Sequence, residues 1–404
     1  MSILQTLREK KQIRYLAIAS ALRGIRDNLR FVTWQPFALS LGIPMRSIGA
    51  LESLMDFAKI IIQPVMGAAS DVYGRKRFLV LRELVMLAAC LCFMLANSWQ
   101  LLAAGMIFIG FGFALLPVWQ SLVAETAPSR ETGMFFSIIG SSYMTTGLIG
   151  TLLAGWLASN MGYRLVYIIS TFFAFTTLVL TFYKIDETHY PEGPKSFTPW
   201  KALKSFIDTF RPPKYLWGFY IAMAVDLLVF STGWRLINGM LTEAFGYTPF
   251  MLGIMTAVNG GSMAIFQIIL GKYVDKVGYV RYLAISQILS CLLIGLLLLN
   301  QSFPVALISN FIMGVAAALW GPAEQAWISI NVESGERAKG IGGYSTFRGI
   351  IALPGPFIGG ILYDNFGYYL PLLINFIGAA IDVGLLVFLV KDRVKPNPTS
   401  QVLG

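Results

Sequence analysis

Charged side chains lie inside stretches that are otherwise apolar, and they are the first candidates for chemistry in this sequence. Many of them occur in two stretches near the N-terminus, at spacings that stack side chains on a helix: Arg23, Arg26, Asp27, Arg30, Glu52, Asp56 and Lys59. An ionisable side chain inside a membrane span is costly and usually functional. The pattern predicts a charge network between the first two helices, which either acts on a solute or compensates itself without contacting one.

The second half of the chain carries fewer charges of this kind. Asp226 and Arg235 lie in one apolar stretch, and Glu324 and Arg348 lie in two later ones, where they could pair as a gate. An arginine can hold a carboxylate or a phosphate through two hydrogen bonds. Arg30 is the leading candidate for a cation that binds a solute. Arg235 lies one residue from the corresponding position of the second half, so the two predict an anion clamp.

If protons drive the movement of a solute, a titratable side chain must carry them. The single histidine, His189, lies in a polar stretch between the two halves. The carrier is then a carboxylate, and the candidates are Asp27, Asp56, Asp226 and Glu324; sodium is the alternative coupling ion. Asp27 and Asp226 would also suit a cationic solute. Asp382, in the last apolar stretch, is expected to pair with another side chain.

No pattern of this sequence indicates an enzyme. The three cysteines, Cys90, Cys92 and Cys291, lack the spacing of a metal site or a disulfide framework. The sequence shows neither a Walker motif nor a catalytic triad. We therefore expect no catalytic residue, no metal and no cofactor.

The composition requires a membrane. The chain has 404 residues, of which 56% are hydrophobic and 13% charged, and its mean hydropathy is +0.66. A soluble protein cannot enclose that much apolar surface. We predict an all-α polytopic membrane protein with twelve helices, each long enough to cross a hydrocarbon layer of about 30 Å. Their expected ranges are 14–41, 47–70, 78–97, 101–124, 133–158, 164–183, 215–242, 250–271, 280–299, 304–330, 340–363 and 368–390.

The basic residues give the orientation of these helices. Of the 31 lysines and arginines, 22 fall in the termini and alternate loops, seven fall within spans, and only Arg46 and Arg164 fall in the opposite loops. Basic loops stay in the cytoplasm, so both termini are expected there, in a multi-pass protein of the cytoplasmic membrane. The net charge of +10 needs no nucleic acid to explain it. The expected partners are membrane lipid and a small-molecule substrate.

A polar stretch divides the chain into two halves. Residues 184–213 contain five prolines and charges of both signs, with apolar residues at helical spacing between 200 and 210. We predict a six-helix bundle over 1–183 and a second over 214–404. The cytoplasmic linker between them, 184–213, is expected to contain a short amphipathic helix on the membrane surface.

One short motif occurs in both halves. Residues 67–77 read GAASDVYGRKR, and residues 271–281, which lie 204 positions later, read GKYVDKVGYVR. The shared positions, together with the first basic residue of the first copy, are Gly67, Asp71, Gly74, Arg75, Arg77, Gly271, Asp275, Gly278 and Arg281. Matches at one fixed offset indicate that the chain is two copies of one unit.

The first copy resembles the loop motif of the major facilitator superfamily, G-x-x-x-D-x-x-G-R-[RK]. The resemblance implies two pseudo-symmetric six-helix bundles, each built of inverted three-helix units. It also implies alternating access around a central site, with both motif loops acting as gates on the cytoplasmic side. In this fold the first, fourth, seventh and tenth helices line the cavity. The resemblance therefore places four tryptophans in the cavity: Trp34, Trp119, Trp234 and Trp320.

Two other patterns of the superfamily match only in part. The fourth helix of proton-driven members carries R-x-x-x-G-x-G-x-A, and here Met106 stands in place of the arginine before Gly110 and Gly112. Drug antiporters carry G-P-x-x-G-G on the fifth helix, whereas this chain has it on the eleventh, at 355–360. We interpret this copy first as a close-packing element.

The sequence predicts a secondary transporter of small amphipathic organic solutes. We expect this transporter to be coupled to protons and to be a monomer. Within this class, an anion or organophosphate carrier would use Arg30 and Arg235. A drug/H⁺ antiporter would use Asp226 and Asp27. A lysolipid flippase and a receptor that transports nothing are further alternatives.

Overall fold

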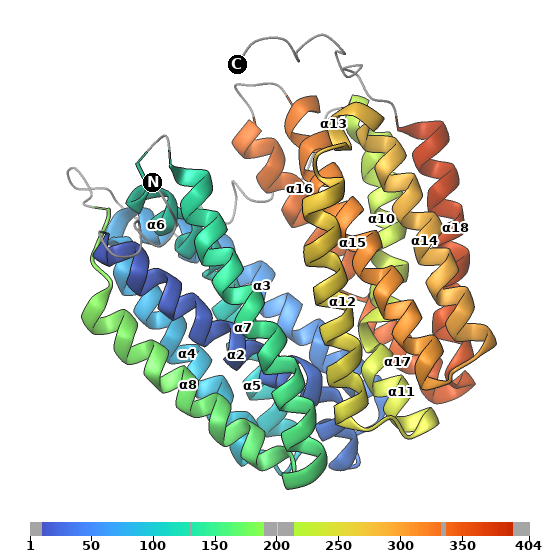
Figure 1. Ribbon diagram of the computed structural model, residues 1–404, viewed down its shortest axis with the longest axis horizontal. Coiled ribbons are helices and arrows are strands. Elements are labelled where there is room, and N and C mark those ends of the chain that lie inside the picture. Colours follow the sequence, from blue (N-terminus) through green and yellow to red (C-terminus); the bar gives the residue numbers. More distant parts are fainter. Residues whose placement is uncertain (1–9, 129–130, 190–199, 201–213, 333–336, 391–404) are drawn as a thin grey trace. The chain divides into compact units, whose positions relative to one another are not determined.

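The structure is a computed structural model that describes residues 10–128, 131–189, 200, 214–332 and 337–390. Its ordered elements are helices (Figure 1). The N-terminal half contains α2 Lys11–Ser40, α3 Met45–Tyr73, α4 Arg75–Leu95, α5 Trp99–Ala114, α6 Leu116–Thr126, α7 Thr132–Met161 and α8 Tyr163–Lys184. The C-terminal half contains η1 Lys214–Leu216, α10 Trp217–Thr232, η2 Trp234–Leu236, α11 Ile237–Phe245, α12 Pro249–Leu270, α13 Val274–Val277, α14 Tyr279–Leu299, α15 Phe303–Asn331, α16 Arg337–Ala352, α17 Gly355–Phe366 and α18 Tyr369–Leu389.

Twelve helical segments of the described residues are long enough to cross a membrane. Ten of them contain an 18-residue stretch of high mean hydropathy with at most two charged residues. The other two are α2 and α3, with 30 and 29 residues, whose buried charges lower their hydropathy. The predicted fold of twelve transmembrane helices is confirmed, and the predicted ends agree to within a few residues.

Three helices predicted to be continuous are interrupted. The fourth breaks at Leu115, because Pro117 in the first turn of α6 has no N–H to continue the ladder of α5. The seventh breaks at Gly233 and continues through the 3₁₀ turn η2. The eleventh breaks before Pro354 and Pro356. In transporters, such breaks expose backbone groups and side chains near the middle of the membrane.

The chain forms two compact units. The first comprises Met1–Ile43, Ala50–Ser205 and Tyr247–Gly253, and the second comprises Pro44–Gly49, Phe206–Gly246 and Ile254–Gly404. The predicted boundaries at 183 and 213 stay a prediction. Most of the predicted linker and its amphipathic helix lie outside the described residues.

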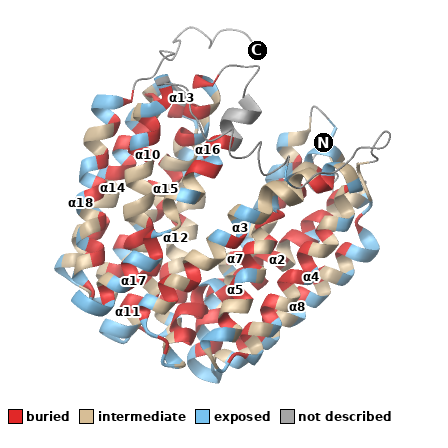
Figure 2. Ribbon diagram, turned by 180° about the vertical axis from the view of Figure 1, so that it is seen from behind, coloured by how far each residue is buried: buried red, intermediate tan, exposed pale blue. Residues whose placement is uncertain are grey.

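Helices α8 and α18 carry large apolar side chains that are more than half exposed, and Figure 2 colours their exposed residues pale blue. On α8, Phe172 and Phe175 are 63% and 56% exposed, and on α18, Phe388 is 80% exposed. Such surfaces are stable only against lipid tails, because water would penalise them. Membrane lipid is therefore the medium that these helices contact.

Small residues let helices approach closely within each unit. In the first unit, Gly24 of α2 faces the backbone of α7 at Tyr143, and Thr146 donates a hydrogen bond of 2.8 Å to the Ala21 carbonyl. In the second unit, Gly355 and Gly359 of α17 face the backbone of α10. The interpretation of the helix-11 motif as a packing element is confirmed.

Replacing Gly359 with alanine is expected to destabilise the second unit. The new methyl group would overlap the backbone of Thr232, so α10 and α17 would have to separate, at about 1–3 kcal/mol. Gly384→Ala in α18 is the matched control, since nothing lies within 4 Å of a methyl group there. Thermal unfolding in detergent should show a lower Tm for Gly359→Ala and no decrease for Gly384→Ala. Equal Tm values would refute the close approach.

Candidate functional site

A buried network of charged groups joins α2 to α4 in the first unit. The Glu83 carboxylate is inaccessible to solvent, and three guanidinium groups surround it. Arg26 Nη1 lies 2.6 Å from Glu83 Oε2, while Arg23 Nη2 and Arg82 Nη1 lie 2.9 Å and 2.7 Å from Glu83 Oε1. Arg26 Nε also donates to Asp27 Oδ1 at 2.8 Å. The network thus holds three cations and two anions away from water.

The sequence analysis missed two members of this network. It selected Arg23, Arg26 and Asp27 but neither Arg82 nor Glu83, which lie in an apolar stretch and satisfy the same rule for charges inside spans. Arg82 Nε also donates to the Gly112 carbonyl of α5 at 3.2 Å. An arginine of α4 therefore contacts the segment that matches R-x-x-x-G-x-G-x-A, in which Met106 stands in place of the arginine.

The charges predicted on the second helix occupy different environments. Glu52 is 6% exposed, Asp56 is half-buried, and each interacts with another group. Lys59 is exposed. The observed ion pairs of Arg23 and Arg26 go to Glu83 and Asp27, so a network between the first two helices stays a prediction.

Arg30 is buried without a counter-ion. The residue is 8% exposed, and in the described part of the chain no carboxylate oxygen lies within 4.0 Å of its guanidinium nitrogens. Asp27, three residues earlier, is occupied by Arg26 and accepts a hydrogen bond of 3.4 Å from Tyr143. Arg30 also interacts electrostatically with Tyr143 and Tyr167. A buried guanidinium in this state favours an anionic ligand, because an unpaired buried charge is costly.

Two of the four predicted cavity tryptophans are enclosed by protein. Trp34 is 2% exposed and Trp119 is 6% exposed. The Arg23 guanidinium lies over the Trp119 ring, with its carbon 3.8 Å from the ring centre, which is a cation–π contact. The Trp119 ring therefore packs against the Arg23 guanidinium of the charge network and is shielded from solvent.

The other two tryptophans are partly exposed, and both lie in the second unit. Trp234 lies with Arg235 on η2, the turn that interrupts the seventh helix. Arg235 therefore lies on a 3₁₀ turn, and it interacts with another group. The predicted clamp of Arg30 and Arg235 stays a prediction. Trp320 packs at the edge of the second unit's apolar core. Cavity lining stays a prediction for both rings.

A second polar cluster occupies the second unit. Arg348 Nη1 lies 2.8 Å from Glu324 Oε2, and the Tyr344 hydroxyl donates to the other oxygen of Glu324. The predicted pairing is confirmed, and a gating role stays a prediction. Asp226 of α10 accepts a hydrogen bond of 2.5 Å from Gln287 of α14.

The first copy of the repeated motif lies in a cluster of ion pairs. Gly74 has a φ of 92°, which glycine adopts without strain, and the chain turns there between α3 and α4. Arg75 pairs with Asp71 at 2.5 Å and with Glu125 at 3.2 Å. Glu187 accepts hydrogen bonds from the backbone N–H groups at the start of α4, at 2.8 and 3.0 Å. The beginning of the predicted linker is therefore bound to this loop.

The second copy keeps the turn but lacks the same ion pairs among the described side chains. Gly278 has a φ of 101°, so it repeats the role of Gly74, and Gly271 ends the preceding helix. Arg281 and Lys272 are exposed. The Asp275 side chain lies outside the described part. The gating roles of both copies stay predictions.

Comparisons with known proteins decide the family. A family model described as Major Facilitator Superfamily matches residues 16–234 and 227–403. The chain belongs to the Major Facilitator Superfamily. Multidrug resistance protein MdtG from Dickeya zeae (strain Ech586) is 27% identical over 327 residues, which cover 79% of this chain and 78% of that protein. MdtG from Salmonella paratyphi A (strain ATCC 9150 / SARB42) is 24% identical over 326 residues, or 79% of each chain.

Solved structures of the superfamily share the fold. The D323A mutant of the nucleoside transporter NupG superposes with a TM-score of 0.79 at 15% identity, over 94% of this chain and 100% of that one. The human organic anion transporter MFSD10 (TETRAN) gives a TM-score of 0.65 at 17% identity, over 94% and 99%. At such identities the likeness shows the fold alone. This superfamily member is a multi-pass membrane protein and a secondary transporter of small molecules.

Proposed function

We propose that this transporter moves amphipathic organic anions out of the cell, in exchange for protons, with Arg30 as the group that binds the anion. The observation that carries the proposal is the burial of Arg30 without a carboxylate within 4.0 Å among the described residues. The connected network beside it adds a further surplus of one positive charge. Both features lower the cost of bringing a negative group into the first unit.

The other parts of the proposal have separate support. Export agrees with the MdtG relatives, whose names describe multidrug resistance. The placement of basic loops supports a cytoplasmic membrane location with both termini inside. Trp234 and Trp320 are partly exposed aromatic surfaces for the apolar portion of a solute. Arg235 is the second candidate cation, and we propose the monomer as the working unit.

A drug/H⁺ antiporter that takes organic cations is the second candidate, and the names of the relatives favour it. Such a solute needs an accessible carboxylate. Asp27 is held by Arg26 and Tyr143, and Asp226 is held by Gln287. A cation would have to displace these partners, whereas an anion at Arg30 would displace none of the carboxylates.

Thermal unfolding with and without ligand separates the two functions. A ligand that binds only the native state at about 100 times its Kd adds roughly 2.7 kcal/mol of stability. Amphipathic carboxylates and phosphates should raise the Tm of the wild type and of Arg164→Ala, which removes an exposed arginine. Arg30→Ala should lose this increase. A Tm increase with lipophilic cations only, lost in Asp226→Asn and retained in Arg30→Ala, would establish the cation exporter instead.

A further inference from the structure

Asp382 is the most deeply buried of the described carboxylates in the second unit, and the function above does not use it. The residue is completely buried on α18. Neither carboxylate oxygen has a hydrogen-bond partner in the described part of the chain. The pairing predicted for Asp382 stays a prediction, because Gln287 acts on its carboxylate without meeting the geometry of a hydrogen bond. A carboxylate without donors in a dry interior is stable only when it carries a proton or binds a cation.

A second carboxylate lies close to Asp382. Helices α10 and α14 both pack against α18, and they bring Asp226 and Gln287 toward it. The amide nitrogen of Gln287 donates to Asp226 Oδ1 at 2.5 Å, and it also acts on the Asp382 carboxylate without meeting the geometry of a hydrogen bond there. Gln287 is itself 2% exposed. The three residues form a buried polar group in which one amide lies between two acids and makes its well-formed hydrogen bond to Asp226.

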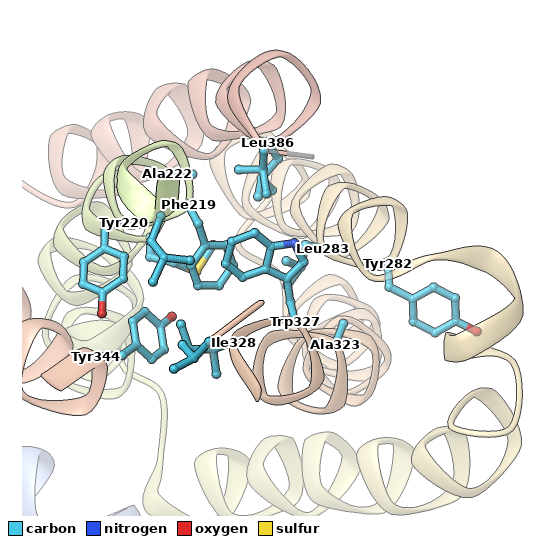
Figure 3. Close-up of a cluster of buried hydrophobic side chains, with 14 of the residues drawn as sticks. Phe219, Tyr220, Ala222, Tyr282, Leu283, Ala323, Trp327, Ile328, Tyr344 and Leu386 are labelled. Atoms are coloured by element: carbon cyan, nitrogen blue, oxygen red, sulfur yellow. The ribbon is translucent and has the colours of Figure 1, made fainter. Parts of the chain in front are cut away.

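An apolar layer closes one side of this group. Ala222, Leu283 and Leu386 each lie four residues, about one helical turn, from Asp226, Gln287 and Asp382 respectively. Figure 3 shows these three side chains around the rings of Phe219 and Trp327, whose centres are 3.9 Å apart. The layer excludes water from that side, and a proton therefore has to enter or leave from another.

Electrostatic interactions link Asp382, through Asp226, to other charged groups of the second unit. Asp226 interacts electrostatically with Glu324 and Arg348 as well as with Asp382. Cys291 of α14 also interacts electrostatically with Asp382. The titratable and charged groups around the site are Asp226 on α10, Cys291 on α14, Glu324 on α15, and Tyr344 and Arg348 on α16. The only cation among them, Arg348, is paired with Glu324.

We propose that Asp382, Gln287 and Asp226 form a proton-binding site in the second unit, with Asp382 carrying the proton. Binding takes one proton from water and converts the Asp382 carboxylate to a carboxylic acid. Release returns the proton to water through Asp226, and no bond to a solute forms or breaks. The site would supply the coupling ion of the proposed transport, and in that respect it rests on the proposed function. The existence of the site does not depend on that function.

Infrared spectroscopy of the purified protein tests the site without any transport. Near neutral pH, the wild type should show the carbonyl stretch of a protonated carboxylic acid in an apolar environment. Asp382→Asn should lose this band, and Asp226→Asn should shift the pH at which it disappears. Glu243→Gln is the control, because Glu243 is an exposed carboxylate of the same unit, and the band should be unchanged. A wild-type band that survives in Asp382→Asn, or that sodium removes at constant pH, would overturn the proposal.

Flux measurements in proteoliposomes test the link to transport. Asp382→Asn should lose solute accumulation driven by a pH gradient and retain exchange of solute at equal concentrations on both sides. A band that depends on Asp382 without any solute flux in the wild type would reject the proposed function and leave the proton site standing. Accumulation that Asp382→Asn retains would show that coupling uses another group.

Discussion

Glu83→Gln is expected to be among the most destabilising substitutions in the first unit. Three arginines surround a carboxylate that is inaccessible to solvent, and the glutamine would leave Arg23 and Arg82 buried without a negative partner. Breaking a buried ion pair by removing one partner costs about 3–5 kcal/mol. We expect a large decrease in Tm in detergent, or a protein that fails to accumulate in the membrane.

A second variant separates charge imbalance from general damage at this position. Arg23→Met combined with Glu83→Gln removes one of the orphaned cations, and it should recover part of the lost stability. Glu125→Gln is the control for a carboxylate that pairs with an arginine at a more exposed position, where a pair contributes about 1 kcal/mol or less. If Glu83→Gln lowers the Tm no more than Glu125→Gln does, the network does not stabilise the fold.

The sequence predicts the architecture of this protein well, because architecture follows from quantities that a sequence contains. Apolar length gives the twelve helices, and the orientation that the basic loops indicate stays a prediction. The fixed offset between Gly74 and Gly278 predicts two related units, and both residues turn the chain with positive φ. Each of these signals is local or periodic, so no knowledge of side-chain packing is needed to read it.

For the candidate site, the sequence predicts some of the residues but not which residues they contact. Charges inside spans point to Arg23, Arg26 and Asp27, but the choice of Glu83 as the common partner of the two arginines depends on which helices pack together. The contact of Trp119 with Arg23 depends on the same packing. The position of Arg235 on a 3₁₀ turn does not follow from a continuous helical spacing, because Gly233 interrupts the helix before it. The partners of buried charges are tertiary properties, and a sequence pattern does not contain them.

The pair of Arg348 and Glu324 is expected to respond unequally to the loss of either partner. The Glu324 side chain is 4% exposed and the Arg348 side chain is 37% exposed. Arg348→Met leaves a buried carboxylate that keeps only the Tyr344 hydroxyl as a donor, at a cost near the 3–5 kcal/mol of a broken buried pair. Glu324→Gln leaves an arginine that can reach solvent, and the glutamine can still accept from Tyr344. This change should cost about 1 kcal/mol, the contribution of one hydrogen bond.

Thermal unfolding of both single variants and of the double variant measures this asymmetry. Arg348→Met should lower the Tm more than Glu324→Gln does. The double variant should be more stable than Arg348→Met alone, because it contains no buried charge without a partner. The effect of the double substitution minus the summed effects of the two single substitutions gives the coupling energy of the pair. Equal effects of the two single substitutions would mean that water already reaches Glu324. In that case Glu324 would be available to exchange protons with Asp226, and the proton route of the second unit would extend to this pair.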